Sequence, residues 1–273
     1  MGSDNQWSTA FAGASVDAMH VYDRILARLF TPWANDLIER LAPLPGCTAL
    51  DIAAGPGTVS HLLAARLTHT GRVIAADISP AMLAVARVKP VEDGWAPIEW
   101  LQAPAAPMPL PDASVDIITC QQGLQFFPDK VGALAEMRRI LRPGGRAGVS
   151  VWTRVEDQIF EYLRDAIAGV VSPALAARYL GPFSLTGEDA ATHARAAGFR
   201  DVELAHVTLP AVMHGGADEL FGTLPAAGIA PDIAALDDAT RAKLRAEVER
   251  LTAPLRDGDA IRSSLSASVL ILS

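Results

Sequence analysis

Short apolar runs alternate with amphipathic stretches through the first 152 residues of the chain. The apolar runs predict strands, and the spacing of apolar residues between them predicts helices at 58–68, 80–88 and 130–141. Near-continuously apolar strands that alternate with helices are typical of a parallel sheet covered on both faces. The pattern therefore predicts a doubly wound α/β fold whose first five strands lie at 47–52, 72–77, 97–102, 115–121 and 146–152.

The pattern changes on both sides of this segment. Residues 15–42, which precede it, have a helical periodicity that Thr31-Pro32 interrupts. After residue 152 the pattern predicts helices at 156–181, at 186–197 behind a Thr cap, and at 215–257. It also predicts strands at 201–209 and in the final run SLSASVLIL.

These elements define an expected organisation with seven strands in a mostly parallel sheet. We expect an N-terminal helical lid over residues 1–44 and a ligand-binding core over 45–153. Residues 154–273 are expected to supply the rest of the sheet and helical cap insertions, all within a single domain.

The turn after the first strand, in the stretch ALDIAAGPGTVSHL, is the first candidate for chemistry. Gly55 and Gly57 allow a sharp turn and let a ligand approach where a Cβ would block it. Ligands of open parallel sheets bind beyond the carboxyl ends of the strands. The turn half-matches the dinucleotide pattern G-x-G-x-x-G, because Ser60 replaces its third glycine while Asp77 supplies the later acid.

Asp51 favours a different ligand. A pyrophosphate at a helix N-terminus needs hydrogen-bond donors and positive potential, so a carboxylate just before the turn would repel it. A cationic ligand would be attracted instead. S-adenosylmethionine has an ammonium and a sulfonium at one end and a ribose diol at the other, which suits an acid on strand one and a second acid, Asp77, on strand two.

Four linked motifs over residues 45–152 resemble the class I S-adenosylmethionine-dependent methyltransferases, especially the small-molecule branch related to ubiquinone and menaquinone biosynthesis. The resemblance implies a Rossmann-like core. It rests on LDIAAGPG, VIAADISPAML, MPLPDASVDIITCQQGLQFFPD and LRPGG, which occur in the family's order and spacing.

The resemblance implies a set of cofactor-binding residues. Asp77 would accept hydrogen bonds from the ribose hydroxyls, and Ile78 and Met82 would pack on the adenine. Tyr22, on the lid, would lie near the methionine carboxylate or the sulfonium. The methionine end would be lined by Asp51, Ala53, Gly55, Gly57 and Gln121.

The sequence departs from the family at two places. Ala53 replaces a frequent glycine, which is a mild change. Ala103-Pro104 stands where the family usually has Gly-Asp, and that Asp accepts a hydrogen bond from the adenine amino group. The loss costs about 1 kcal/mol, so we expect cofactor binding to be weakened but not abolished, with the adenine held by backbone groups and packing.

Methyl transfer needs alignment of the acceptor with the sulfonium methyl, and a general base only for some acceptors. His20 and Gln125 are the candidate catalytic residues, because His20 lies in the lid and Gln125 follows strand four. The other histidines are expected to be non-catalytic, with His61 and His69 on the surface.

Composition excludes several other classes of function. The net charge of −8 and the pI of about 5.2 argue against nucleic acid or an anionic membrane as a partner. Cys47 and Cys120 lack the nearby Cys or His that zinc spacing requires, so no metal is expected. No apolar run approaches a membrane span and the N-terminus is unlike a signal peptide, so we expect a cytoplasmic enzyme.

Three functional hypotheses remain open at this stage. The first is methyl transfer to oxygen, carbon or nitrogen of a small, largely apolar metabolite, such as a natural product or a quinone-like compound, with S-adenosyl-L-homocysteine as product. The second keeps the cofactor but catalyses a cyclisation, rearrangement or decarboxylation. The third is a non-catalytic binding module. A homodimer is compatible with each of them, and a gain of one methyl group in the product's mass distinguishes the first.

Overall fold

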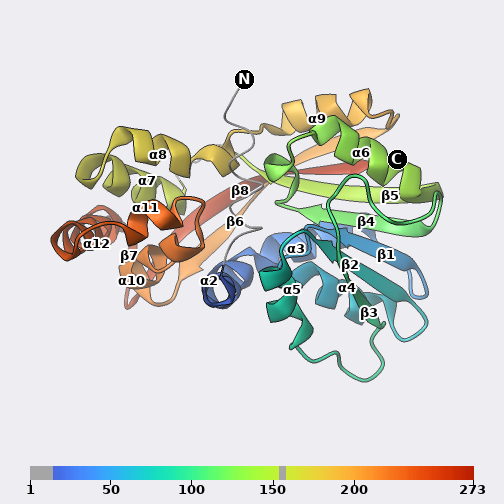
Figure 1. Ribbon diagram of the computed structural model, residues 1–273, viewed down its shortest axis with the longest axis horizontal. Helices are drawn as coiled ribbons and strands as arrows, with labels where there is room; N and C mark the ends of the chain where they lie inside the picture. The colour runs from blue at the N-terminus through green and yellow to red at the C-terminus, as the bar shows by residue number, and fades with distance from the viewer. Residues whose placement is uncertain (1–14, 154–157) are drawn as a thin grey trace.

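The computed structural model describes residues 15–153 and 158–273 of the chain. Its centre is a sheet in the order β3-β2-β1-β4-β5-β8-β6 (Figure 1). β1 to β5 are parallel, and β8 is antiparallel to both β5 and β6. The doubly wound, mostly parallel α/β fold is therefore confirmed, and its strand order reverses between β1 and β4.

The strands follow the apolar runs of the sequence. A further two-residue strand, β7, pairs only with β8. The bounds are β1 (Thr48–Ile52), β2 (Arg72–Asp77), β3 (Ile98–Gln102), β4 (Val115–Gln121), β5 (Leu141–Trp152), β6 (Val202–Met213), β7 (Arg256–Asp257) and β8 (Ala260–Leu272).

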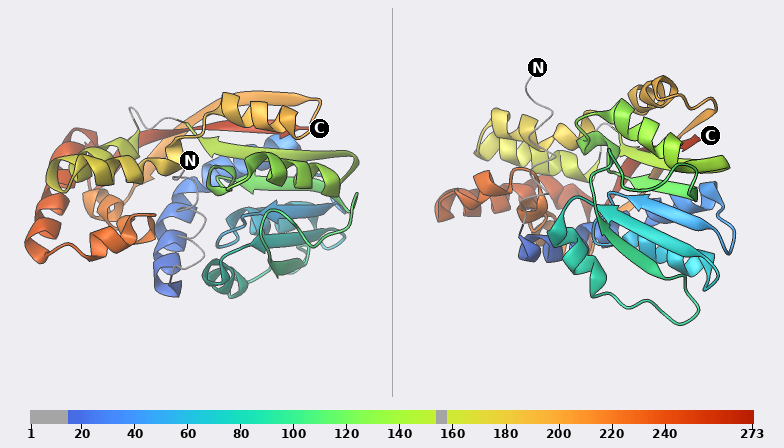
Figure 2. Two further views of the ribbon diagram at one scale, coloured as in Figure 1. Left: turned by 45° about the horizontal axis from the view of Figure 1, so that its top comes forward. Right: turned by 45° about the vertical axis from the view of Figure 1, so that its right-hand side comes forward.

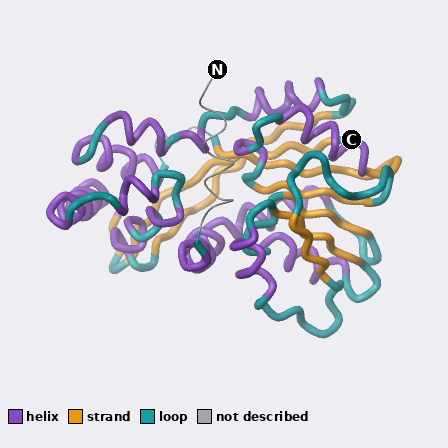
Figure 3. The backbone as a smooth tube through the Cα atoms, in the orientation of Figure 1, coloured by secondary structure: helices purple, strands orange, loops and turns teal. Residues whose placement is uncertain are grey.

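Helices cover both faces of the sheet (Figures 1 and 3). Consecutive strand residues point to opposite faces: Ala49 packs in the hydrophobic cluster that contains α3 and α4, whereas Leu50 packs in the cluster that contains α6 and α9. The helices around the sheet are α2 (Val16–Val21), a π-helical turn (Tyr22–Ala27), α3 (Arg28–Leu41), α4 (Thr58–Leu67), α5 (Pro80–Arg87), α6 (Lys130–Ile140) and α9 (Gly187–Ala196).

A second group of helices surrounds the end of the long β6–β8 pair. These strands remain paired as far as Met213↔Ile261, beyond Ala267, which is the last partner of β5. The hairpin therefore projects from the sheet, and helices from the later part of the chain gather around it (Figure 2). We call them the helical cap: α7 (Ile159–Val170), α8 (Pro173–Tyr179), α10 (Gly216–Phe221), α11 (Ala230–Ala234) and α12 (Asp238–Thr252).

Short 3₁₀ turns complete the chain at Leu124–Phe126, Gly181–Phe183, Leu224–Ala226 and Ala253–Leu255. As expected, Thr186 caps α9, because its side chain accepts a hydrogen bond from the backbone N–H of Asp189. No helix in the described ranges is long and apolar enough to cross a membrane.

Four expectations about the elements were wrong. The helix expected at 156–181 is divided into α7 and α8, because Ser172-Pro173 starts a new helix. Thr31-Pro32 does not interrupt the N-terminal helix, because Pro32 lies inside α3, where burial of Phe30 and Trp33 on the sheet outweighs the lost backbone hydrogen bond. β5 begins at Leu141 rather than at 146, since the ladder shifts register instead of ending at the Pro-Gly-Gly turn. The region 215–257 is divided among α10, α11 and α12.

Candidate functional site

A cavity of about 410 Å³ lies at the carboxyl ends of β1, β2 and β4, where the strand order reverses. This is the position at which open α/β sheets bind ligands. Many of the residues expected to contact a cofactor line it, namely Tyr22, Ala53, Gly55, Asp77, Ile78, Met82, Ala103, Pro104 and Gln121.

The two glycines of the first turn have different roles. Gly55 has φ +56°, lines the cavity, and would bring an added Cβ no nearer than 3.9 Å to Met82, so it leaves room for a ligand. Gly57 has φ +84° and is absent from the cavity lining. An added Cβ at Gly57 would lie 2.6 Å from the ring of Trp100, so this glycine lets β3 pack against the turn.

Asp77 lies at the end of β2 and is 8% exposed. Its carboxylate accepts hydrogen bonds from the backbone N–H groups of Gly55 and Ser79, both at 2.8 Å. Burial raises the pKa of Asp77, and these hydrogen bonds oppose the rise. Ser79, not Asp77, caps α5, so the acid is available to a ligand in the cavity.

Asp51 lies beneath the turn rather than on the main cavity. It is 1% exposed, and it accepts hydrogen bonds from the hydroxyl groups of Ser60 at 2.6 Å and Thr119 at 2.7 Å. It borders a second cavity of about 40 Å³, which shares Tyr22 and several other residues with the first. Burial raises the pKa of Asp51 to about 6, against the effect of the two hydroxyl groups.

Gln121 ends β4, Gln122 follows it, and both line both cavities. The Gln121 side-chain N–H donates to the backbone carbonyl of Phe30 at 3.1 Å, which leaves its amide oxygen for a ligand. Gln122 is 7% exposed, has φ +55°, and its amide has no hydrogen-bond partner among the described residues. A buried unpaired amide in a strained backbone conformation is costly and marks a candidate binding residue.

Tyr22 reaches the site from the π-helical turn between α2 and α3. α2 is held in place by Met19, which is 1% exposed and packs against Met82 and Val85 of α5. The Tyr22 ring meets Phe30 edge to face at 6.4 Å. Burial, with the nearby Asp77, raises the pKa of the Tyr22 hydroxyl well above its usual range. The expected lid thus contributes through Tyr22, while its residues 1–14 lie outside the described ranges.

The two candidate catalytic residues do not line this cavity. His20 is exposed in the last turn of α2. Gln125 is half-buried, and its amide has no partner among the described residues. His61, expected on the surface, is half-buried because its ring packs near Trp100 and hydrogen-bonds the Gly57 carbonyl at 2.7 Å, whereas His69 is exposed as expected.

The charges of the site suit a cationic ligand. Neither Asp51 nor Asp77 forms an ion pair with a Lys or Arg in the described ranges, although both are buried, and the charge of Asp77 contributes to the raised pKa of Asp51 and of Tyr22. Together with the unpaired amide of Gln122 and the apolar walls of Ile78 and Met82, they fit a molecule with a cationic amino-acid end, a ribose and a flat ring. No group of three possible metal ligands occurs among the described residues.

Comparisons with known proteins agree with this reading of the site. The sequence model of the ubiE/COQ5 methyltransferase family matches residues 15–177. The ubiquinone/menaquinone biosynthesis C-methyltransferase UbiE of Teredinibacter turnerae is 36% identical over 144 residues, which are 52% of this chain and 58% of that protein. The chain thus matches less than two thirds of the length of this curated relative.

Solved structures show the same fold at low sequence identity. The YcgJ protein of Bacillus subtilis is 19% identical with a TM-score of 0.54, covering 88% of this chain and 96% of that one. Phosphoethanolamine N-methyltransferase 2 of Haemonchus contortus, solved with S-adenosyl-L-methionine, is 16% identical with a TM-score of 0.58, covering 95% of this chain and 57% of that one.

Proposed function

The chain belongs to the ubiE/COQ5 methyltransferase family, and from that membership we propose that it transfers a methyl group from S-adenosyl-L-methionine to a small, largely apolar metabolite. The observation that carries the proposal is the cavity at the strand switch point, which joins a buried acid on β2 to the unpaired amide of Gln122. The curated relatives are named as C-methyltransferases of quinone biosynthesis, which favours carbon as the acceptor atom and a quinone-like ring as the substrate.

When bound, the cofactor supplies an electrophilic methyl group on a sulfonium centre. The protein then has to bind the cofactor and the acceptor, align them and exclude water from the site. Asp77 is positioned to accept hydrogen bonds from the ribose hydroxyls, because its oxygens retain lone pairs beside those used by Gly55 and Ser79. Gln122 offers both a donor and an acceptor to an amino-acid end.

Asp51 contributes its buried negative charge without lining the main cavity. Asp51 lies beneath the glycine turn in a site of low dielectric, so its charge stabilises a nearby cation more than a surface acid would. No histidine lies among the described residues that line the cavity. We therefore expect acceleration to come from alignment and electrostatics rather than from a histidine base.

The first test is titration calorimetry of the purified protein with S-adenosyl-L-methionine and with S-adenosyl-L-homocysteine. Both should bind, and Asp77→Asn should weaken both by about tenfold or more, because an amide cannot replace both oxygens of the carboxylate. Asp93→Asn, at an exposed loop position, is the matched control and should bind as the wild type does. Failure of both ligands to bind would refute the proposal.

The second test identifies the chemistry. The protein is incubated with a cell extract and cofactor labelled on its methyl group, and the products are analysed by mass spectrometry. A labelled product heavier by one methyl group is the expected result. An isomerised or decarboxylated product with unconsumed cofactor would contradict methyl transfer.

A further inference from the structure

Two segments form an apolar part of the cavity wall. Ala103 to Ala106 follow β3, and Phe126 to Asp129, with Ala133, lead into α6. The side chains of these lining residues are Ala, Pro and Phe, with the single exception of Asp129. Its carboxylate is therefore the only side-chain hydrogen-bond acceptor that these two described segments present to the cavity.

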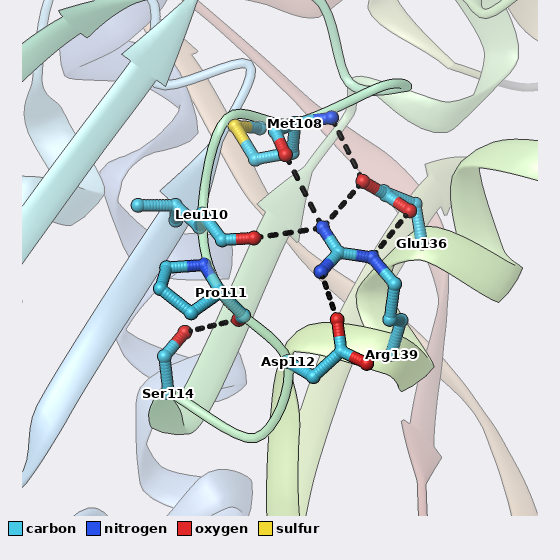
Figure 4. A network of polar contacts seen from close by, with 7 residues as sticks. All are labelled: Met108, Leu110, Pro111, Asp112, Ser114, Glu136 and Arg139. Carbon is cyan, nitrogen blue, oxygen red and sulfur yellow. Dashed lines mark hydrogen bonds and ion pairs between the residues drawn. The ribbon is translucent and has the colours of Figure 1, made fainter.

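A network of polar contacts joins α6 to the loop that continues from Ala106 (Figure 4). Arg139 of α6 donates to the backbone carbonyls of Met108 at 3.2 Å and Leu110 at 2.9 Å. Glu136 accepts from the backbone N–H of Met108 at 2.9 Å and from Arg139 at 2.7 Å. The loop after β3 is thus fixed to the helix that Asp129 caps. The two segments of the cavity wall are therefore held in a fixed position relative to each other.

Asp129 has one oxygen left for a ligand. It caps α6 through Oδ1, which accepts from the backbone N–H of Gly132 at 2.8 Å. No other described residue donates to its Oδ2. Asp129 is exposed, so its Oδ2 is accessible to water. Removing this oxygen from water costs free energy only when a ligand covers it.

The loop after β3 does not offer such an acceptor. Pro104 stands where the resemblance placed an acid that accepts from the adenine amino group, and its neighbours Ala103, Ala105 and Ala106 have no polar side-chain atoms. We propose that Asp129 replaces that acid and accepts the hydrogen bond from the exocyclic amine of the cofactor's base. The proposal rests on the function proposed above and adds a residue that determines which base is accepted.

The test changes each partner of the proposed hydrogen bond in turn, the amine of the ligand and the carboxylate of Asp129. S-adenosyl-L-homocysteine and its 6-desamino purine analogue, which differ only in the amine, are titrated into the wild type and into Asp129→Asn. Asparagine can still cap α6 through its oxygen, and its NH₂ group then replaces Oδ2 with a donor. The wild type should prefer the amine-bearing ligand by about fivefold, and the variant should lose that preference.

Asp237→Asn is the matched control. Asp237 caps α12 in the same way, by accepting from the backbone N–H of Thr240 at 2.7 Å, but it does not line the cavity. This variant should retain the wild-type preference, and melting curves of both variants report whether the caps are kept. An unchanged preference in Asp129→Asn would overturn the inference and leave the amine to backbone carbonyls. Absence of binding of either ligand to the wild type would overturn the proposed function as well.

Discussion

The sheet half of the molecule, residues 45–152, differs from the helical cap in what its buried residues do. In the sheet half, the largely buried strands β1, β2 and β4 lead to Gly55, Asp77 and Gln121, which converge on one cavity. In the cap, helices bury apolar faces against one another and carry exposed ion pairs such as Asp218–Arg245. No residue of the cap lines the cofactor cavity in the described ranges.

This difference suggests that the sheet half and the cap have different roles. Cofactor binding should depend on backbone conformation and buried charge in the sheet half, and on Tyr22, which lines the cavity from the described part of the N-terminal segment. The cap should matter for stability and for the acceptor. Substitutions of the same kind in both regions therefore test whether the two regions differ in this way.

The largest effect is expected for Gly57→Ala. The substitution meets two costs, a left-handed φ of +84° and a Cβ placed 2.6 Å from the Trp100 ring. Strain and overpacking together should lower the free energy of unfolding by about 4 kcal/mol. Since the same turn carries Gly55, binding of S-adenosyl-L-homocysteine should be lost or strongly weakened. Denaturant unfolding and calorimetry measure both effects.

Gly258→Ala, in the turn between β7 and β8, is the matched control. Gly258 also has a left-handed φ, of +61°, but nothing lies within 4 Å of an added Cβ. It should cost about 1 kcal/mol from strain alone and leave cofactor binding unchanged. Equal losses of stability in the two variants would show that contact with Trp100 does not constrain the turn.

The second prediction concerns the core of the cap. Leu244 is fully buried on α12, which packs against α7. Leu244→Ala should lower the free energy of unfolding by about 3 kcal/mol because it leaves a cavity. Affinity for S-adenosyl-L-homocysteine at a temperature where the variant is folded should be that of the wild type.

The neighbouring exposed residue gives the control, since Lys243→Ala removes a side chain of α12 that is not buried. It should change the stability by less than about 0.5 kcal/mol. A clear loss of cofactor affinity in Leu244→Ala, but not in Lys243→Ala, would mean that the cap and the cofactor site are coupled.

The difference between local patterns and distant contacts also determines how much of the fold the sequence alone could predict. β1 was expected at 47–52 and spans Thr48–Ile52, and α4 was expected at 58–68 and spans Thr58–Leu67. Such boundaries are readable because a buried apolar run ends at glycines with special backbone angles. Pro32 was misread as a break because its helix is stabilised by packing on distant strands, which local sequence does not report.

The site was predictable at the level of residue type but not of contact. Asp77 and Gly55 line the cavity as expected, since strand ends and turns follow from the pattern. Gly57 contacts Trp100 on another strand, and Asp51 binds Ser60 and Thr119, and neither arrangement has a local signal. Gln122 was not among the expected cofactor-binding residues, although its place directly after β4 at the strand switch point was a usable signal.

The third prediction tests the buried charge of the sheet half through pH. Burial raises the pKa of Asp51 in the folded protein to about 6, from a model-compound value of 3.8. The folded state therefore binds this proton more tightly than the unfolded state, so its ionisation destabilises the fold above about pH 6 and does not below about pH 4. Asp51→Asn should raise the free energy of unfolding near pH 7 by about 2 kcal/mol relative to the wild type, and change it little near pH 4.

The same variant should bind S-adenosyl-L-methionine more weakly, because it lacks the charge that attracts the cation. Asp218→Asn supplies the cap counterpart, in which an exposed pair with Arg245 holds the pKa of the acid below its usual range. Its pH dependence has the opposite sign, since the pair stabilises the fold only when Asp218 is ionised. The effect should be small because the pair is solvated. A gain of stability without weaker binding in Asp51→Asn would rule out an electrostatic role for Asp51.

The smallest effect is expected for Tyr22→Phe, which removes one hydroxyl group and keeps the ring that meets Phe30. Because Tyr22 borders both cavities near Asp77, we expect its hydroxyl to contact the cofactor. Its loss should weaken binding of S-adenosyl-L-methionine about threefold to fivefold, the equivalent of roughly 1 kcal/mol. Tyr179→Phe makes the same change at a buried position of the cap and should leave the affinity unchanged. If calorimetry gives equal affinities for the two variants, Tyr22 packs on the site without binding the ligand, and the sheet half alone holds the cofactor.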